Sequence, residues 1–69
     1  MKLYCYKLYD KDENITDVYH TVAKDNKAVH TMLDAHMKSI ENAGLSDTYY
    51  SYRFFEVYDV NGYRVDLKR

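Results

Sequence analysis

The sequence contains no proline, no tryptophan, a single cysteine and only two glycines. Because Cys5 stands alone, no disulfide can form within the chain, and a cysteine-rich zinc site is excluded. Residues 1–69 make a single domain with a small core. Domains of this size that lack disulfides depend on regular packing or on self-association.

Charge and hydropathy also exclude several classes of protein. Ten basic and eleven acidic side chains give a net charge of −1, so the chain has no basic excess to follow a phosphate backbone. No segment approaches the roughly 20 apolar residues that span a bilayer. Lys7 and Asp10 interrupt the apolar stretch that a signal peptide requires. These features predict a cytoplasmic protein.

The first third of the chain predicts a β-hairpin. Residues 2–10 (KLYCYKLYD) and 15–22 (ITDVYHTV) are rich in aromatic and β-branched residues, which favour strands. A three-residue loop over 12–14 would join them, with Asn14 in the left-handed conformation. This loop gives even-numbered residues on one face, in the pairs Leu8–Val18, Tyr6–His20 and Tyr4–Val22. A slip of one residue gives the alternative pairs Leu3–Val22 and Cys5–His20.

Residues 26–43 predict an amphipathic helix. Its apolar stripe recurs at spacings of three and four, over Val29, Met32, Leu33, His36, Met37, Ile40 and Ala43. Asp25 is a suitable N-cap. Gly44 suits a left-handed residue after the helix, with Leu45 against Ile40 in a Schellman ending. His36 lies at the centre of the stripe, which predicts a buried imidazole whose protonation would loosen the fold.

The C-terminal part of the chain predicts a second hairpin around Asn61-Gly62, since a type I′ turn needs positive φ at both central residues. This turn gives the pairs Val60–Tyr63, Asp59–Arg64, Tyr58–Val65 and Glu56–Leu67. The element order is then ββαββ. It predicts an α+β two-layer sandwich, in which a four-stranded antiparallel sheet of order 2-1-3-4 carries the helix (about 26–43) on one face.

One helix covers only one side of such a sheet, so the other side is the predicted interaction surface. The expected registers place the following residues there: Leu3, Cys5, Tyr9, Tyr19, Arg53, Phe55 and Val57. Charged neighbours on the same side are Lys7, Asp17, Arg64 and Asp66. An apolar area with a charged rim is typical of a protein–protein interface. Because two-fold dimers are the commonest assembly, a second copy of the chain is the expected partner.

The sequence predicts a binding protein without catalytic activity. Its Lys-, Asn- and Tyr-rich composition is typical of AT-rich genomes, including small open reading frames of phages and mobile elements. We therefore expect a regulatory protein, for example an inhibitor of a host defence or nucleic-acid enzyme such as an anti-CRISPR. The alternative is a single-stranded nucleic-acid-binding module that uses the aromatic side chains of the sheet, because YRFFEVYDV places aromatics beside Arg53.

No arrangement of residues predicts a catalytic, metal, cofactor or small-molecule substrate site. Cys5 and His20 would form a nucleophile–base pair only if they shared a face, and the expected register separates them. His30 and His36 are six residues apart, whereas two ligands on one helix need a spacing of three or four.

Overall fold

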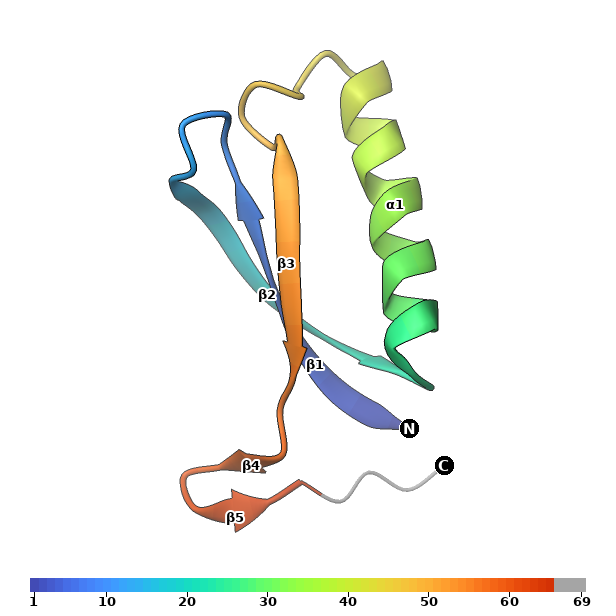
Figure 1. The fold of residues 1–69 in the computed structure, drawn as a ribbon, viewed down its shortest axis with the longest axis vertical. Helices are drawn as coiled ribbons and strands as arrows, with labels where there is room; N and C mark the ends of the chain where they lie inside the picture. Colours follow the sequence, from blue (N-terminus) through green and yellow to red (C-terminus); the bar gives the residue numbers. More distant parts are fainter. Residues whose placement is uncertain (66–69) are drawn as a thin grey trace.

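The fold is an α+β arrangement in which one helix packs against a three-stranded sheet (Figure 1). A computed structural model describes residues 1–65. Its elements are β1 (Lys2–Tyr9), β2 (Ile15–Ala23), α1 (Asn26–Asn42), β3 (Ser51–Glu56), β4 (Asp59–Val60) and β5 (Tyr63–Arg64). β1 pairs antiparallel with both neighbours in the order β2-β1-β3, and β4 and β5 form a separate two-stranded sheet. Within residues 1–65, no helix has the length and apolar character needed to cross a membrane.

The turn between β1 and β2 is organised by Asp10. Its Oδ1 accepts hydrogen bonds from the backbone N–H groups of Asp12 and Asn14, both at 2.9 Å. The bonds from the Asn14 and Asp12 backbones lower the pKa of the Asp10 carboxyl, since they favour its ionised form. Glu13 takes the left-handed conformation, with φ of 66°. The prediction that Asn14 does so is wrong, because the Asp10 carboxylate closes the turn one residue earlier.

This turn changes the register of the first hairpin. Next to the turn, β2 is displaced by two residues from its expected pairing with β1. A bulge at Thr16 reverses one of these two residues, so the rest of the hairpin is displaced by one. The resulting pairs are Leu3–Val22, Tyr4–Thr21, Cys5–His20, Tyr6–Tyr19, Lys7–Val18 and Leu8–Asp17. The expected register is therefore wrong, and the alternative with a slip of one residue is confirmed. Residues 17–23 of β2 consequently lie on the opposite face from the one expected.

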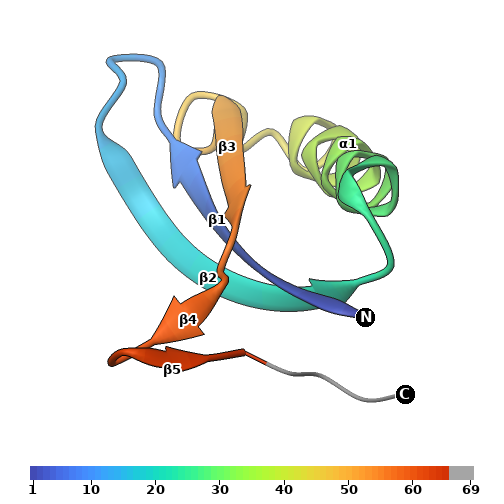
Figure 2. The ribbon, with the colours of Figure 1, turned by 60° about the horizontal axis from the view of Figure 1, so that its bottom comes forward.

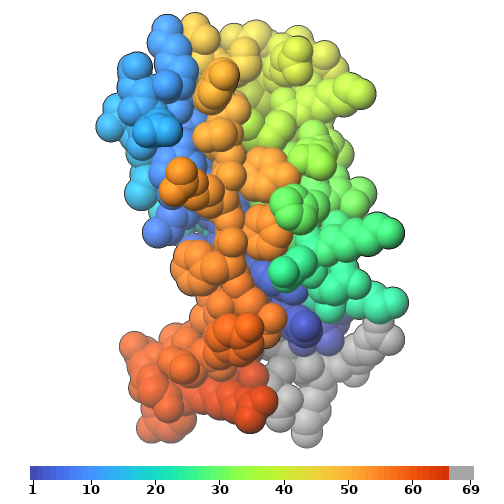
Figure 3. All heavy atoms as spheres, in the orientation of Figure 1, coloured from blue at the N-terminus to red at the C-terminus, as the bar shows by residue number. Residues whose placement is uncertain are grey.

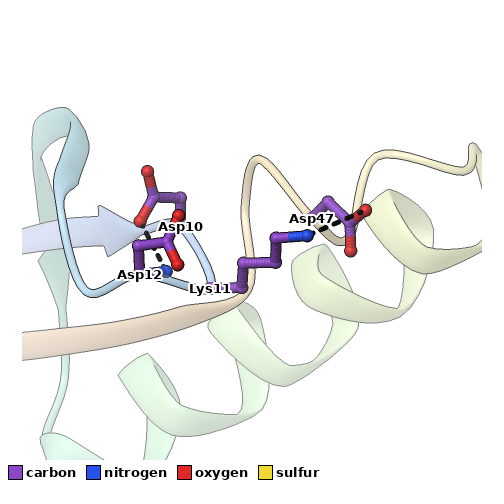
Figure 4. Close-up of polar contacts among 4 residues, drawn as sticks. All are labelled: Asp10, Lys11, Asp12 and Asp47. Carbon is purple, nitrogen blue, oxygen red and sulfur yellow. Dashed lines mark hydrogen bonds and ion pairs between the residues drawn. The ribbon is translucent and has the colours of Figure 1, made fainter.

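The same turn contacts the loop that enters β3. The Lys11 backbone N–H donates to the Asp47 carbonyl at 3.3 Å, and the Lys11 Nζ lies 3.9 Å from Asp47 Oδ2 (Figure 4). Both side chains are largely exposed, so the ion pair adds little stability. These contacts fasten the two loops at this end of the sheet to one another.

Both predicted ends of the helix are confirmed. The Asp25 carboxylate accepts from the Ala28 N–H at 2.9 Å, as an N-cap does. At the other end Gly44 has φ of 75°, and the Leu45 N–H donates to the Ile40 carbonyl at 3.0 Å. That bond, with the one from Gly44 to Glu41, is the Schellman pattern.

The core lies between α1 and the even-numbered face of β1. Tyr4, Val29 and Leu33 are fully buried, and Leu8 and Ile40 are buried beside them. Partly buried side chains packed against this centre are Tyr6, Ala23, Tyr52 and Phe54. The expected register places Val18 and Val22 on the face of Tyr4 and Leu8, under the helix, and this is wrong, because the observed register turns both away from the helix.

The predicted burial of His36 is also wrong, since this residue is exposed. Leu33 and Val29 occupy the centre of the interface instead. The hypothesis that protonation of a desolvated His36 loosens the core therefore loses its structural basis.

The second hairpin forms in the expected register but not as part of the main sheet. Asn61 and Gly62 both have positive φ, and Asp59–Arg64 and Val60–Tyr63 pair as predicted. The Val65 N–H donates to the Tyr58 carbonyl at 2.7 Å. The pairing predicted for Leu67 lies outside the described residues. β4 does not continue β3 in the main sheet because Val57 already bonds to Leu3, next to the start of β1, so that β4 lies beyond the end of its neighbouring strand. The single four-stranded sheet is therefore wrong for residues 1–65 (Figure 2).

Candidate functional site

The candidate site is the side of the three-stranded sheet that α1 does not cover, which we call the open face. Its side chains follow from strand alternation, because Tyr4 and Leu8 point toward the helix and their neighbours point away. They are Leu3, Cys5, Lys7 and Tyr9 of β1; Ile15, Val18, His20 and Val22 of β2; Ser51, Arg53 and Phe55 of β3; and Val57, whose N–H donates to the Leu3 carbonyl.

Six of the seven residues predicted for the interaction surface lie on this face. Tyr19 does not, because it pairs with Tyr6 on the helix side, where the ring centroids are 5.4 Å apart. Asp17 moves to the helix side for the same reason. Arg64 belongs to the separate hairpin, and Asp66 lies outside the described residues.

The open face exposes apolar side chains from both outer strands. Val18, Val22 and Phe55 are 51%, 47% and 52% exposed, respectively. They surround Cys5, which is buried although it points away from the helix. Exposed apolar area that extends across several strands is typical of a surface that meets another molecule.

Two cations lie over aromatic rings on this face. The Lys7 Nζ is 5.8 Å from the centroid of the Phe55 ring, and the Arg53 guanidinium is 5.4 Å from that of Tyr9. Such cation–π contacts contribute about 0.5–1 kcal/mol each at exposed sites. These contacts favour positions of the cationic head groups above the sheet.

The open face carries no carboxylate side chain among the residues that form it. Because the net charge of the whole chain is −1, its acidic groups lie elsewhere. Asp17 was the acidic residue of β2 expected here, and the observed register turns it toward the helix. The face therefore combines apolar, aromatic and basic groups.

Cys5 and His20 lie directly opposite each other on the open face, which corrects the expectation that they are separated. Cys5 is buried, whereas His20 is exposed. A buried cysteine in an apolar environment acts as a packing residue.

The three histidines lie on different surfaces. His20 is on the open face, His30 contacts Tyr52 of β3, and His36 lines a hollow between α1 and β2. Within residues 1–65, no three His, Cys, Asp or Glu side chains are grouped so as to hold a metal ion.

The hollow between α1 and β2 receives Tyr19. It has a volume of about 260 Å³ and is lined by Leu8, Asp17, Tyr19, His36, Ile40, Leu45 and Tyr49. The charge of Asp17 and a hydrogen bond to it raise the pKa of the Tyr49 phenol, because both disfavour the phenolate. α1 contacts the other end of β2, where Thr21 lies against Met32 and Ala23 packs against the core.

A polar chain between α1 and β3 was missed by the sequence reasoning. The Tyr52 hydroxyl donates to Asp34 Oδ1 at 2.7 Å, and the His30 Nδ1 lies 3.0 Å from the same hydroxyl. The His30 ring also packs edge-on against Phe54, with centroids 4.8 Å apart. The signal was the spacing of four between His30 and Asp34, which places both on one side of a helix. This His30–Tyr52–Asp34 chain fixes the helix over the β3 side of the sheet.

Replacing Tyr52 by phenylalanine is expected to lower the free energy of unfolding by about 1 kcal/mol, because one hydroxyl makes both contacts. The hydrogen bond to Asp34 raises the pKa of Tyr52. The stabilisation should therefore persist below about pH 10 and disappear as the pH rises through the raised value. Urea denaturation of the parent and of Tyr52→Phe, at pH values below and above about 10, measures this difference in the free energy of unfolding. Tyr58→Phe is the matched control, since Tyr58 is 69% exposed, and an equal loss in that variant would contradict the assignment.

Comparisons of the chain with protein-family models, curated proteins and solved structures find no match.

Proposed function

We propose that this chain is a non-enzymatic protein-binding module whose open face contacts a partner with an acidic, partly apolar surface. The observation that supports this proposal is the composition of the open face. Exposed Val18, Val22 and Phe55 adjoin two cations that lie over aromatic rings, with no carboxylate among the side chains of the face. Apolar contacts would supply affinity, and the basic groups would select an acidic partner.

A second copy is a poor occupant of this particular face. Face-to-face association about a two-fold axis brings a surface against its own copy. Lys7 and Arg53 would then meet an equally basic surface that has no carboxylate to neutralise them. Like charges brought together across an interface oppose binding, so the partner of the open face should be a different molecule.

Single-stranded nucleic acid fits the open face less well than an acidic protein does. Stacking of bases requires free aromatic faces. Here the Lys7 and Arg53 head groups lie over the rings of Phe55 and Tyr9. Two cations also neutralise few phosphates, and phosphate neutralisation supplies most non-specific affinity. A protein partner is therefore the better-supported occupant, and a stoichiometric inhibitor or adaptor is the role that suits such a surface.

Selection from a random peptide library and from a random single-stranded oligonucleotide library tests the proposal. The expected result is enrichment of peptides that carry Asp or Glu beside apolar residues, with no oligonucleotide retained at physiological salt. The Lys7→Glu/Arg53→Glu variant should bind the selected peptides roughly tenfold or more weakly.

The control variant Lys27→Glu/Lys38→Glu makes the same change in net charge on exposed positions of α1. It should bind as the parent does. An equal loss of peptide affinity in the two variants would show that only the net charge matters, and would contradict the proposed site. Enrichment of oligonucleotides without peptides would favour the nucleic-acid alternative instead.

A further inference from the structure

The outer edge of β3 has no strand partner among residues 1–65, since the sheet order is β2-β1-β3. The Val57 N–H donates to the Leu3 carbonyl, so the odd-numbered residues of β3 form the hydrogen-bonded pairs with β1. In an antiparallel ladder, the residues between such pairs direct their N–H and C=O groups to the other side. Tyr52, Phe54 and Glu56 therefore present backbone donors and acceptors along the outer edge. Figure 3 shows β3 (orange) along the front of the molecule, with α1 (green) beside it.

This edge lacks the features that usually prevent strand addition. Natural edge strands are protected by proline, lysine, bulges or strong curvature. β3 contains neither proline nor lysine, and its two charged residues, Arg53 and Glu56, have opposite signs. The other edge strand, β2, carries the bulge at Thr16 and is strongly curved (Figure 2). The two edges of the sheet are therefore not equivalent, and β3 is the one suited to pairing.

The sequence around β3 is complementary to itself. Antiparallel pairing of two outer edges requires that even-numbered residues face even-numbered residues. A two-fold axis at Phe54 satisfies this and gives the pairs Tyr52–Glu56 and Arg53–Phe55 between the copies, all within β3. An axis at Arg53 would oppose two arginines, and one at Phe55 would place Tyr52 beyond the end of the other strand.

In the register centred on Phe54, the Arg53–Phe55 pair would place a cation beside an aromatic ring across the junction.

We propose that the outer edge of β3 pairs antiparallel with β3 of a second copy of this chain about a two-fold axis at Phe54. The two sheets then form one continuous sheet, with both helices on the same side and both open faces on the other. This interface goes beyond the proposed function and does not depend on it, since the edge lies beside the open face and leaves it uncovered.

Amide hydrogen exchange at low and high protein concentration tests the pairing residue by residue. The Arg53 and Phe55 amides should be protected at both concentrations because they bond to β1. The Tyr52, Phe54 and Glu56 amides should exchange quickly at low concentration and become protected at high concentration, in step with a dimer in sedimentation. Protection of these amides at every concentration, or at none, would overturn the proposal.

Glu56→Pro and Glu56→Ala form a matched pair of variants. Both remove the ion pair with Lys2, but only proline removes the outward N–H, which an edge strand tolerates. Glu56→Pro is expected to be monomeric with Arg53 and Phe55 still protected, whereas Glu56→Ala should dimerise as the parent does. If the proline variant does not fold, a synthetic chain with N-methyl-Phe54 provides the same test, because the methyl group removes an outward N–H and leaves every side chain unchanged. Dimerisation of a folded blocked chain as strong as that of the parent would contradict the interface.

Discussion

Tyr4→Ala is expected to lower the free energy of unfolding by about 3–5 kcal/mol, which is most of the stability of a domain this small. Tyr4 is fully buried with Val29 and Leu33, and its ring meets Phe54 edge-on with centroids 6.0 Å apart. Alanine would leave a cavity between the helix and the central strand that few neighbours can fill. Urea denaturation followed by circular dichroism measures the loss. A variant that unfolds at nearly the same urea concentration would show that Tyr4 is not the centre of the core.

The hydroxyl group of Tyr4 should contribute nothing to this stability. It is buried and has no hydrogen-bond partner among residues 1–65. Burial also raises the pKa of this phenol, because the phenolate would lie in the apolar core. Tyr4→Phe is therefore expected to be as stable as the parent, or more stable by about 1 kcal/mol, since an unpaired buried hydroxyl is destabilising. A loss of stability in Tyr4→Phe would reveal a partner for the hydroxyl.

Local signals in the sequence predict the helix better than they predict the sheet. The Asp25 cap and the Gly44 ending each depend on contacts within a few residues, and both are confirmed. The register of the first hairpin depends on which of two neighbouring turns closes. Asn14 and Asp10 both favour a turn, and only the three-dimensional structure shows that the Asp10 carboxylate prevails.

The choice of turn, and with it the register of the first hairpin, determines the chemistry of the candidate site. It removes Asp17 and Tyr19 from the open face and brings Val18, His20 and Val22 onto it. The face becomes more apolar and loses its expected carboxylate. Most of its β1 and β3 residues were predictable from alternation alone, whereas its charge was not.

The rotation of the helix was not predictable from its apolar stripe. The stripe is centred near His36, yet the buried side is displaced toward β3 and leaves His36 and Met32 exposed. The contacts of His30 and Asp34 with Tyr52 lie on the side to which the helix is displaced. Such polar contacts join elements far apart in the sequence, so helical periodicity does not report them.

Alanine substitutions at two adjacent helix positions distinguish the observed rotation from the one that the stripe predicts. Leu33→Ala should cost about 2–5 kcal/mol, because Leu33 is fully buried against Tyr4. Met32→Ala should cost less than about 1 kcal/mol, because Met32 is 38% exposed beside Thr21. Both substitutions introduce the best helix former, so helix propensity does not account for the difference. Equal losses of unfolding free energy in the two variants, measured by urea denaturation, would instead support the rotation centred on His36.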